Sequence, residues 1–301
     1  VSGAFSLAML TPDSLIAVRD PHGFRPLALG RLGDAFVVCS ETCAMDLIGA
    51  TYEREIEPGE VLVIGPDGPR SYKPFPTVTP AHCVFEHVYF SRPDSYVFGQ
   101  SVNEVRTNLG KLLASESGVD ADVVVPIPDS GLCAASGYAE SSGIPLRMGL
   151  IRNHYVGRTF IEPSQSIRNF GVKLKHNANR AEIEGRRVLL VDDSIVRGTT
   201  MRALVTNLKE WSGAKEVHLR IGCPPITSPC FYGIDFPTIK ELYAGSNKPN
   251  PKDFNADSLK YLSLGGLLGA INKKRGDLCM ACLTAKYPTP EGTKRWKEQN
   301  V

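Results

Sequence analysis

The sequence predicts an α/β protein with a mostly parallel sheet flanked by helices, preceded by a β-rich segment. Beyond residue 80, short apolar runs alternate with stretches of helical apolar spacing, which is the pattern of βαβ units. Before residue 66, apolar runs of strand length follow one another with turn residues between them. With 301 residues, the chain is long enough for one large domain or two ordinary ones.

The amino-terminal part is expected to consist of strands and turns. Strands are predicted at 3–10, 14–20, 26–32, 35–40 and 60–65, the last followed by a Pro-Asp-Gly turn. Residues 66–80 are dense in proline, and we interpret them as a linker. We therefore predict a β-rich domain with its linker over residues 1–78 and an α/β domain over residues 79–301.

The second domain is expected to alternate between strands and helices. Strands are predicted at 121–128, 145–151, 186–193 and 215–222, and helices at 103–117, 130–143 and 200–213. Gly213 is a plausible C-cap for the last helix.

Composition argues against several classes of partner. The net charge is only +2, so there is no bulk electrostatic attraction to nucleic acid or to an anionic membrane. No apolar run approaches the roughly 20 residues that cross a bilayer. The first residues lack a basic leader and a small-residue cleavage site, so we expect a cytoplasmic protein. The chain opens on Val1 rather than Met, which indicates processing or a fragment.

The stretch VLLVDDSIVRGTT, residues 188–200, places Asp192 and Asp193 directly after an apolar strand. Adjacent carboxylates repel each other, and in an open parallel sheet ligands bind at the carboxyl ends of the strands. The loop that follows offers backbone N–H groups, hydroxyls and a helix start to a phosphate, while carboxylates are ligands for Mg²⁺. These features indicate a sugar phosphate with a second, metal-bound phosphate group. A capped turn with solvated acids is the alternative.

The same loop resembles the phosphoribosylpyrophosphate (PRPP) loop of type I phosphoribosyltransferases. Further stretches resemble the glutamine PRPP amidotransferase family, and in their cysteines its iron–sulfur subgroup. These stretches are RDPHGFRPLALG, SETCAMDLIGA, CVFEHVYFSRPDS, VVVPIPDSG, HYVGRTFIEPSQSIRNFGVKLK, PPITSPCFYGID and CMACLTAKYPT. The resemblance implies a type I phosphoribosyltransferase fold preceded by the carboxy-terminal part of an N-terminal-nucleophile glutaminase α+β sandwich.

The resemblance also implies the residues of the site. PRPP would be bound by two segments at strand ends, namely Asp129, Ser130 and Gly131, and Asp192, Asp193, Ser194, Ile195, Val196, Arg197, Gly198, Thr199 and Thr200. Mg²⁺ would be held by Ser130, Asp192 and Asp193. Without the resemblance, a plain strand-ending turn is the alternative for residues 129–131.

The segment 152–175 is long and basic, with Arg152, Arg158, Arg168, Lys173 and Lys175. By resemblance it closes over PRPP, and Arg152, Arg158 and Lys175 are the residues expected to act there. Composition alone equally allows a solvated surface loop.

The implied reaction is displacement at C1 of PRPP by ammonia, which gives 5-phosphoribosylamine and pyrophosphate, the first committed step of de novo purine synthesis. The family implies a homo-oligomer, usually a tetramer, and feedback inhibition by purine nucleotides. In complete members, an N-terminal cysteine releases the ammonia from glutamine. The first cysteine here is Cys39, so we expect no glutamine-dependent activity and at most the use of free ammonia.

Two other functions compete with this one. A regulator of the same fold would bind PRPP or a nucleotide without catalysis, but such regulators can lose the closing loop, which is retained here. A cluster-bearing structural subunit would leave Asp192 and Asp193 unexplained.

The chain has eight cysteines, and reduced thiols or metal ligands fit its size and composition better than disulfides. By resemblance Cys83, Cys230, Cys279 and Cys282 hold a [4Fe–4S] cluster. Zinc on the same four thiolates is the main competitor, and Cys223 is a rival ligand outside the family pattern. Cys39, Cys43 and Cys133 are expected to be buried apolar thiols.

Overall fold

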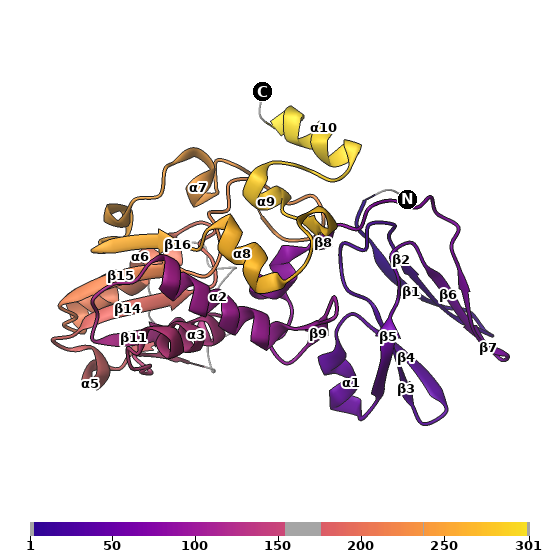
Figure 1. Ribbon diagram of the computed structural model, residues 1–301, viewed down its shortest axis with the longest axis horizontal. Coiled ribbons are helices and arrows are strands. Elements are labelled where there is room, and N and C mark those ends of the chain that lie inside the picture. The colour runs from indigo at the N-terminus through magenta and orange to yellow at the C-terminus, as the bar shows by residue number, and fades with distance from the viewer. Residues whose placement is uncertain (1–2, 154–175, 237, 300–301) are drawn as a thin grey trace. The chain divides into compact units, whose positions relative to one another are not determined.

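The computed structural model describes residues 3–153, 176–236 and 238–299. Contacts divide the chain into two compact units, whose parts are coloured by residue number in Figure 1. The first unit comprises Val1–Val105, Ser228–Thr238 and Ile271–Val301, and the second comprises Arg106–Thr227 and Ile239–Ala270. The predicted boundary near residue 78 divides two segments by their family origin, and it stays a prediction.

The amino-terminal part of the first unit contains two antiparallel sheets. Strands β1 (Ser6–Leu10), β2 (Leu15–Arg19), β6 (Val61–Gly65) and β7 (Gly68–Tyr72) form one sheet in the order β1-β2-β6-β7. Strands β3 (Ala28–Leu32), β4 (Ala35–Cys39) and β5 (Thr51–Glu55) form the other in the order β4-β3-β5, and helix α1 (Thr42–Ile48) follows β4. Their shared core consists of Ala17, Leu27, Leu29, Ile56 and Leu62.

The prediction of a linker over residues 66–80 is wrong in its first half. Residues 68–72 form β7, which pairs with β6 across the predicted Pro-Asp-Gly turn. The proline-rich composition suggested a linker, but β7 is an edge strand. An edge strand tolerates a proline, because it pairs along one side only.

The turn after β2 is organised by two buried charged side chains. Arg19 is fully buried, and its guanidinium donates to the carbonyl of Arg25 (2.9 Å) and contacts the Glu55 carboxylate (3.2 Å). Asp20 is also fully buried and accepts backbone N–H bonds from His22 and Phe24. The RDPHGFRPL stretch is therefore a turn whose shape is set by these two side chains.

The remainder of the first unit is built from short elements: β8 (His82–Cys83), the π-helix η1 (Glu86–Phe90), β9 (Tyr96–Val97), β10 (Gln100–Ser101), η4 (Arg275–Asp277), β17 (Leu278–Cys279), α9 (Ala281–Thr284) and α10 (Pro290–Gln299). Strands β8 and β17 pair in parallel. That pairing joins segments almost 200 residues apart in the sequence.

The second unit contains the predicted parallel sheet. Strands β11 (Val123–Pro126), β14 (Arg187–Asp192), β15 (Glu216–Ile221) and β16 (Ser258–Tyr261) lie in the order β11-β14-β15-β16, and every neighbouring pair is parallel (Figure 1). Residues 123–126 and 188–191 are buried throughout, as strands covered on both faces should be. Strand β16 was missed because SLKY carries no long apolar run.

The helices associated with this unit are α2 (Val102–Glu116), whose first turn belongs to the first unit, α3 (Leu132–Ser142), α5 (Arg180–Ile183), α6 (Thr199–Thr206) with its π-helical continuation η2 (Asn207–Trp211), α7 (Tyr243–Ser246), η3 (Pro251–Phe254) and α8 (Leu264–Ile271). The predicted helices at 103–117, 130–143 and 200–213 are confirmed. In the described part of the chain, no helix is long and apolar enough to span a membrane.

The strand predicted at 145–151 is largely wrong. Only β12 (Leu150–Arg152) is a strand there, and it pairs with β13 (His176–Ala178) outside the main sheet. Before it, Leu146 forms an isolated parallel bridge with Val124 of β11.

Helices α2 and α3 meet at two glycines. A Cβ atom on Gly110 would lie 1.9 Å from the Ala134 carbonyl oxygen, and one on Gly137 would lie 1.9 Å from the Thr107 carbonyl oxygen. No side chain fits between backbones this close, so the glycines fix how closely α3 packs beside α2.

We predict that Gly110→Ala destabilises the protein by about 1–3 kcal/mol, the usual cost of overpacking. Urea unfolding measures this. Gly269→Ala is the matched control, because Gly269 is exposed in α8 and its Cβ would meet nothing nearer than 3.6 Å. The control should be neutral or stabilising by up to about 1 kcal/mol. Equal effects of the two substitutions would contradict the close-packing argument.

Candidate functional site

The site begins where two neighbouring parallel strands end. Strands β11 and β14 pair up to Pro126 and Val191, and the Ile127 N–H extends the pairing by donating to the Val191 carbonyl (2.9 Å). The segment after β11 is thereby held next to the segment after β14. These are the two segments that the sequence assigned to PRPP, and the structure brings them together.

The two segments meet through side chains. Asp193 is buried, and its carboxylate accepts hydrogen bonds from the hydroxyls of Ser130 and Ser194. The Asp193 N–H donates to Oδ1 of Asp192 at 2.9 Å. Ser130, Asp192 and Asp193, the three residues expected to hold Mg²⁺, therefore lie side by side.

Burial raises the pKa of both carboxyls of the acidic pair. It raises the pKa of Asp192 well above its usual range, and the charge of Asp193 raises it further. The pKa of Asp193 is also raised by burial, while its bonds with Ser130 and Ser194 and the charge of Arg106 oppose the rise. Two carboxylates in this setting favour a bound cation, because a cation removes both the repulsion and the desolvation cost.

The loop Ser194–Thr200 leads from the acidic pair into α6. Gly198 is the residue before the helix and has a left-handed backbone (φ 77°), which an L side chain rarely adopts. Ile195 and Gly198 are buried, while Arg197, Thr199 and Thr200 are exposed. The loop therefore has a buried, anchored side and an exposed side with hydroxyls and a guanidinium, next to the N-terminus of a helix, where anions bind.

Gly131 is required by the closeness of the two strand ends. A Cβ atom at this position would lie 2.5 Å from the Val191 carbonyl oxygen and 2.9 Å from the Ile127 carbonyl oxygen. Asp129, two residues earlier, is exposed and forms an ion pair with Arg152, and the Pro128–Asp129 peptide bond is cis.

Of the residues expected in the closing segment, only Arg152 belongs to the described residues. It is the last residue of β12 and lies opposite His176 of β13. Arg158, Arg168, Lys173 and Lys175 lie outside the described residues.

Comparison with known protein families accounts for this arrangement. Residues 98–223 match the family model described as phosphoribosyl transferase domain. The match includes β11, β14, β15 and both strand-end segments. The two strand-end segments therefore lie in the part of the chain that is similar to a phosphoribosyl transferase domain. The predicted α/β fold with its parallel sheet is thereby confirmed.

Over nearly its whole length, the chain is similar to amidophosphoribosyltransferases. It is 52% identical to that of Bacillus subtilis and 54% identical to the chloroplastic amidophosphoribosyltransferase 1 of Arabidopsis thaliana, in alignments that cover 96% of this chain. It covers 62% and 51% of those proteins, so it spans between half and two thirds of their length. The structure of the B. subtilis glutamine PRPP amidotransferase complexed with ADP and GMP matches with a TM-score of 0.89 at 51% identity, covering 95% of this chain and 64% of that one.

Two neighbours of the acidic pair were missed by the sequence. Cys223 follows β15 and is fully buried, and the charges of Asp192 and Asp193 add to the burial that raises its pKa. Arg106 in α2 is buried as well, and its charge acts on Asp193. Neither was detectable, because only the sheet register places β15 next to β14 and only helix packing brings α2 to the site.

The four cysteines assigned to a cluster all belong to the first unit. Cys83 and Cys279 lie opposite each other in the pairing of β8 with β17. Cys230 packs against the aromatic cluster that contains Cys279, and the Ser228 N–H donates to the carbonyl of Cys282 (3.1 Å). Cys223, the expected rival ligand, belongs to the second unit.

Burial keeps two of these thiols protonated. It raises the pKa of Cys83 well above its usual value and that of Cys279 to about 12, and Cys230 contributes to both shifts. Among the described residues, no three His, Cys, Asp or Glu side chains converge closely enough to hold a metal ion.

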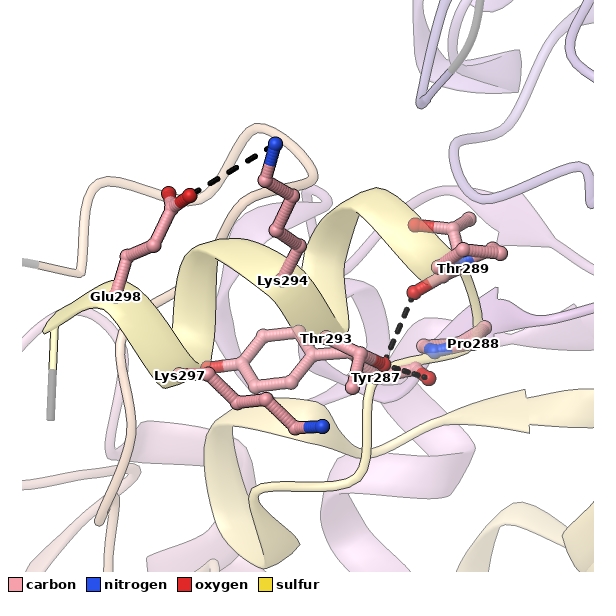
Figure 2. Close-up of a pocket in the computed structure, with 8 residues that line it drawn as sticks. Tyr287, Pro288, Thr289, Thr293, Lys294, Lys297 and Glu298 are labelled. Carbon is pink, nitrogen blue, oxygen red and sulfur yellow. Dashed lines mark hydrogen bonds and ion pairs between the residues drawn. The ribbon is translucent and has the colours of Figure 1, made fainter.

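A surface pocket of about 550 Å³ lies at the carboxy-terminal end of the described chain (Figure 2). It is lined by Tyr287, Pro288, Thr289, Pro290, Thr293, Lys294, Lys297 and Glu298. The Thr293 hydroxyl contacts the Thr289 carbonyl (3.1 Å), and Lys294 pairs with Glu298 at 3.9 Å along α10. These residues belong to the first unit, whereas both strand-end segments belong to the second.

We predict that Asp192→Asn stabilises the ligand-free protein, because the substitution removes a carboxylate charge. Oδ1 of the asparagine can still accept the hydrogen bond from the Asp193 N–H. A carboxyl whose pKa is raised on folding binds more protons in the folded state. Wild-type stability should therefore fall as pH rises from about 4 towards neutrality, and the variant should lose much of that dependence. Thermal unfolding at pH 5 and pH 7 without Mg²⁺ tests this.

Asp122→Asn is the control for that experiment. Its carboxylate pairs with Arg187, which lowers the pKa of Asp122 to about 2, the opposite direction. The control should not raise the melting temperature. A melting temperature for Asp192→Asn below that of the wild type at pH 7 would contradict the electrostatic account.

Proposed function

We propose that the chain carries the phosphoribosyl-transfer half of an amidophosphoribosyltransferase: PRPP and ammonia react to give 5-phosphoribosylamine and pyrophosphate. The observation that carries this is the contact of Ser130 with Asp193, which joins the ends of β11 and β14 into one hard-oxygen site beside an anion-binding loop. The similarity to amidophosphoribosyltransferases along 96% of the chain supports the same activity.

Each part of the site has a role in this reaction. The N–H groups of loop Ser194–Thr200 and the start of α6 bind the 5-phosphate of PRPP. The acidic pair accepts hydrogen bonds from ribose hydroxyls and, with Ser130, provides ligands for Mg²⁺. Two carboxylates and a hydroxyl fit this ion, since Mg²⁺ takes one or two carboxylates and fills its shell with substrate oxygens and water. When bound, Mg²⁺ neutralises charge on the leaving pyrophosphate.

The reaction needs no protein nucleophile. The nitrogen lone pair of ammonia attacks C1, the bond between C1 and the pyrophosphate oxygen breaks, and the new amine loses a proton to solvent. The protein contributes orientation of the ribose and a fixed set of charges around the leaving group. Arg152, which pairs with Asp129 in the structure, is a described cation at this edge and adds positive charge for the pyrophosphate.

Purified chain should release pyrophosphate from PRPP in the presence of Mg²⁺ and ammonium salts at raised pH. The double variant Asp192→Asn with Asp193→Asn should lose this activity and weaken PRPP binding at least about tenfold, because it removes charge-assisted hydrogen bonds. Calorimetry and a pyrophosphate assay measure the two effects. PRPP binding without turnover by the wild type would favour the non-catalytic regulator, and unchanged affinity in the folded double variant would refute the assignment of the site.

The same proposal extends to regulation and location. The B. subtilis relative was solved in complex with ADP and GMP, and we propose purine nucleotides as inhibitors of this chain. A homo-oligomeric assembly and a cytoplasmic location stay predictions, and chloroplastic relatives show that location varies among similar proteins.

We further propose that Cys83, Cys230, Cys279 and Cys282 bind a [4Fe–4S] cluster. Four thiols from three distant segments gather in one unit around the pairing of β8 with β17. Burial raises the pKa of Cys83 and Cys279, so these two thiols ionise only with strong positive charge beside them, which the irons of a cluster would supply. The sulfur donors fit the cluster chemically, and the side chains must converge further to bind it.

Protein purified without oxygen should be brown and contain about four iron and four sulfide per chain. Cys230→Ser should lose the colour and the sulfide. Cys223→Ser is the matched control, because this buried thiol lies in the other unit, and it should retain both. Stoichiometric zinc without sulfide would replace the cluster by a zinc site.

A further inference from the structure

A segment far from the acidic pair in the sequence packs against the proposed phosphate loop. Residues 239–254, here named the bracing segment, belong to the second unit and contain α7 and η3. The Tyr243 N–H donates to the Val196 carbonyl at 2.8 Å. This bond fixes the loop midway between the acidic pair and the start of α6.

Two aromatic rings of the bracing segment form the surface on which Gly198 rests. Tyr243 and Phe254 are both buried, with ring centroids 4.7 Å apart. A Cβ atom on Gly198 would lie 3.0 Å from Cε1 of Phe254 and 3.5 Å from Cδ2 of Tyr243. The rings therefore lie directly against the one loop residue that adopts a left-handed backbone.

The Tyr243 hydroxyl holds the bracing segment together. It donates to Oδ2 of Asp253 at 2.9 Å and accepts from the Asn250 N–H at 2.9 Å. These bonds bring η3 back to α7 and so place Phe254 beside Tyr243. Removing the hydroxyl would leave both rings in place but loosen their connection.

The segment is also tied to both ends of the loop-to-helix junction. Arg197 in the loop pairs with Glu241 at 3.8 Å. Arg202 in α6 donates through Nε to the Asp253 carbonyl at 2.7 Å. The loop is thus connected to the bracing segment before, at and after Gly198.

We propose that Tyr243 and Phe254 are positioning residues, which hold loop Ser194–Thr200 in its phosphate-binding conformation before the ligand arrives. The proposal rests on the proposed binding of PRPP at this loop. A loop that binds an anion through backbone N–H groups must have them aligned, and alignment before binding avoids an ordering cost on association. Neither residue contacts the ligand. Both act through Val196 and Gly198.

The test compares three variants by two measurements. Tyr243→Phe removes the hydroxyl, and Phe254→Leu removes the ring from Gly198 while keeping an apolar side chain. Tyr138→Phe is the control, since this tyrosine is equally buried in the same unit but its hydroxyl donates to the Ser117 carbonyl (3.0 Å). The measurements are amide hydrogen exchange of residues 194–200 without ligand, and calorimetry of PRPP in the presence of Mg²⁺.

Tyr243→Phe and Phe254→Leu should speed exchange in the loop and weaken PRPP affinity about tenfold, the scale of one buried hydrogen bond. Tyr138→Phe should lose comparable thermal stability without either change. Faster exchange with unchanged PRPP affinity, or equal effects of the control, would overturn the proposal. If Phe254→Leu does not fold, Tyr243→Phe decides. Wild-type protein that fails to bind PRPP refutes the proposed function instead, and the exchange rates then still decide whether the segment braces the loop.

Discussion

The acidic pair at the end of β14 is the constraint on which the architecture of the second unit depends. Two adjacent carboxylates lose solvation when the sheet forms, and the pKa of both is raised. The surroundings offset this cost with hydroxyls from Ser130 and Ser194 and with the buried charge of Arg106. These groups come from three elements, so the position of the pair requires the correct packing of α2 and of the β11 end against β14.

Close backbone approach is the second requirement, and glycines meet it. Gly131 lets the segment after β11 lie against the Val191 carbonyl, and Gly110 and Gly137 let α2 approach α3. The part of α2 that carries Arg106 is thereby held close to α3. Larger residues at these points would push apart the elements that surround the carboxylates, so tight packing and the electrostatics of the site are linked.

Sequence reasoning recovered what is encoded locally. The alternation of apolar runs and helical spacing predicted β11, α3, β14, α6 and β15, and the resemblance assigned both strand-end segments, which the sheet then places together. It failed where neighbours are set only by tertiary packing. Strand β16 reads SLKY, a weak pattern that becomes a strand by pairing with β15. Tyr243 and Phe254 carry no motif, since their significance comes from lying against Gly198.

The cysteines show the same division between composition and geometry. Their spacing could not separate Cys223 from the other candidates, but the fold buries it near two carboxylates. Burial raises the pKa of its thiol, and the charges of the carboxylates raise it further. A thiolate there would add a third negative charge to a buried acidic site. The thiols of Cys83 and Cys279 are also held neutral by burial. An iron–sulfur cluster can reverse that effect without opposing a carboxylate pair. The ions proposed for the two units differ accordingly: a hard cation for the oxygen donors of the second unit, and iron for the sulfur donors of the first.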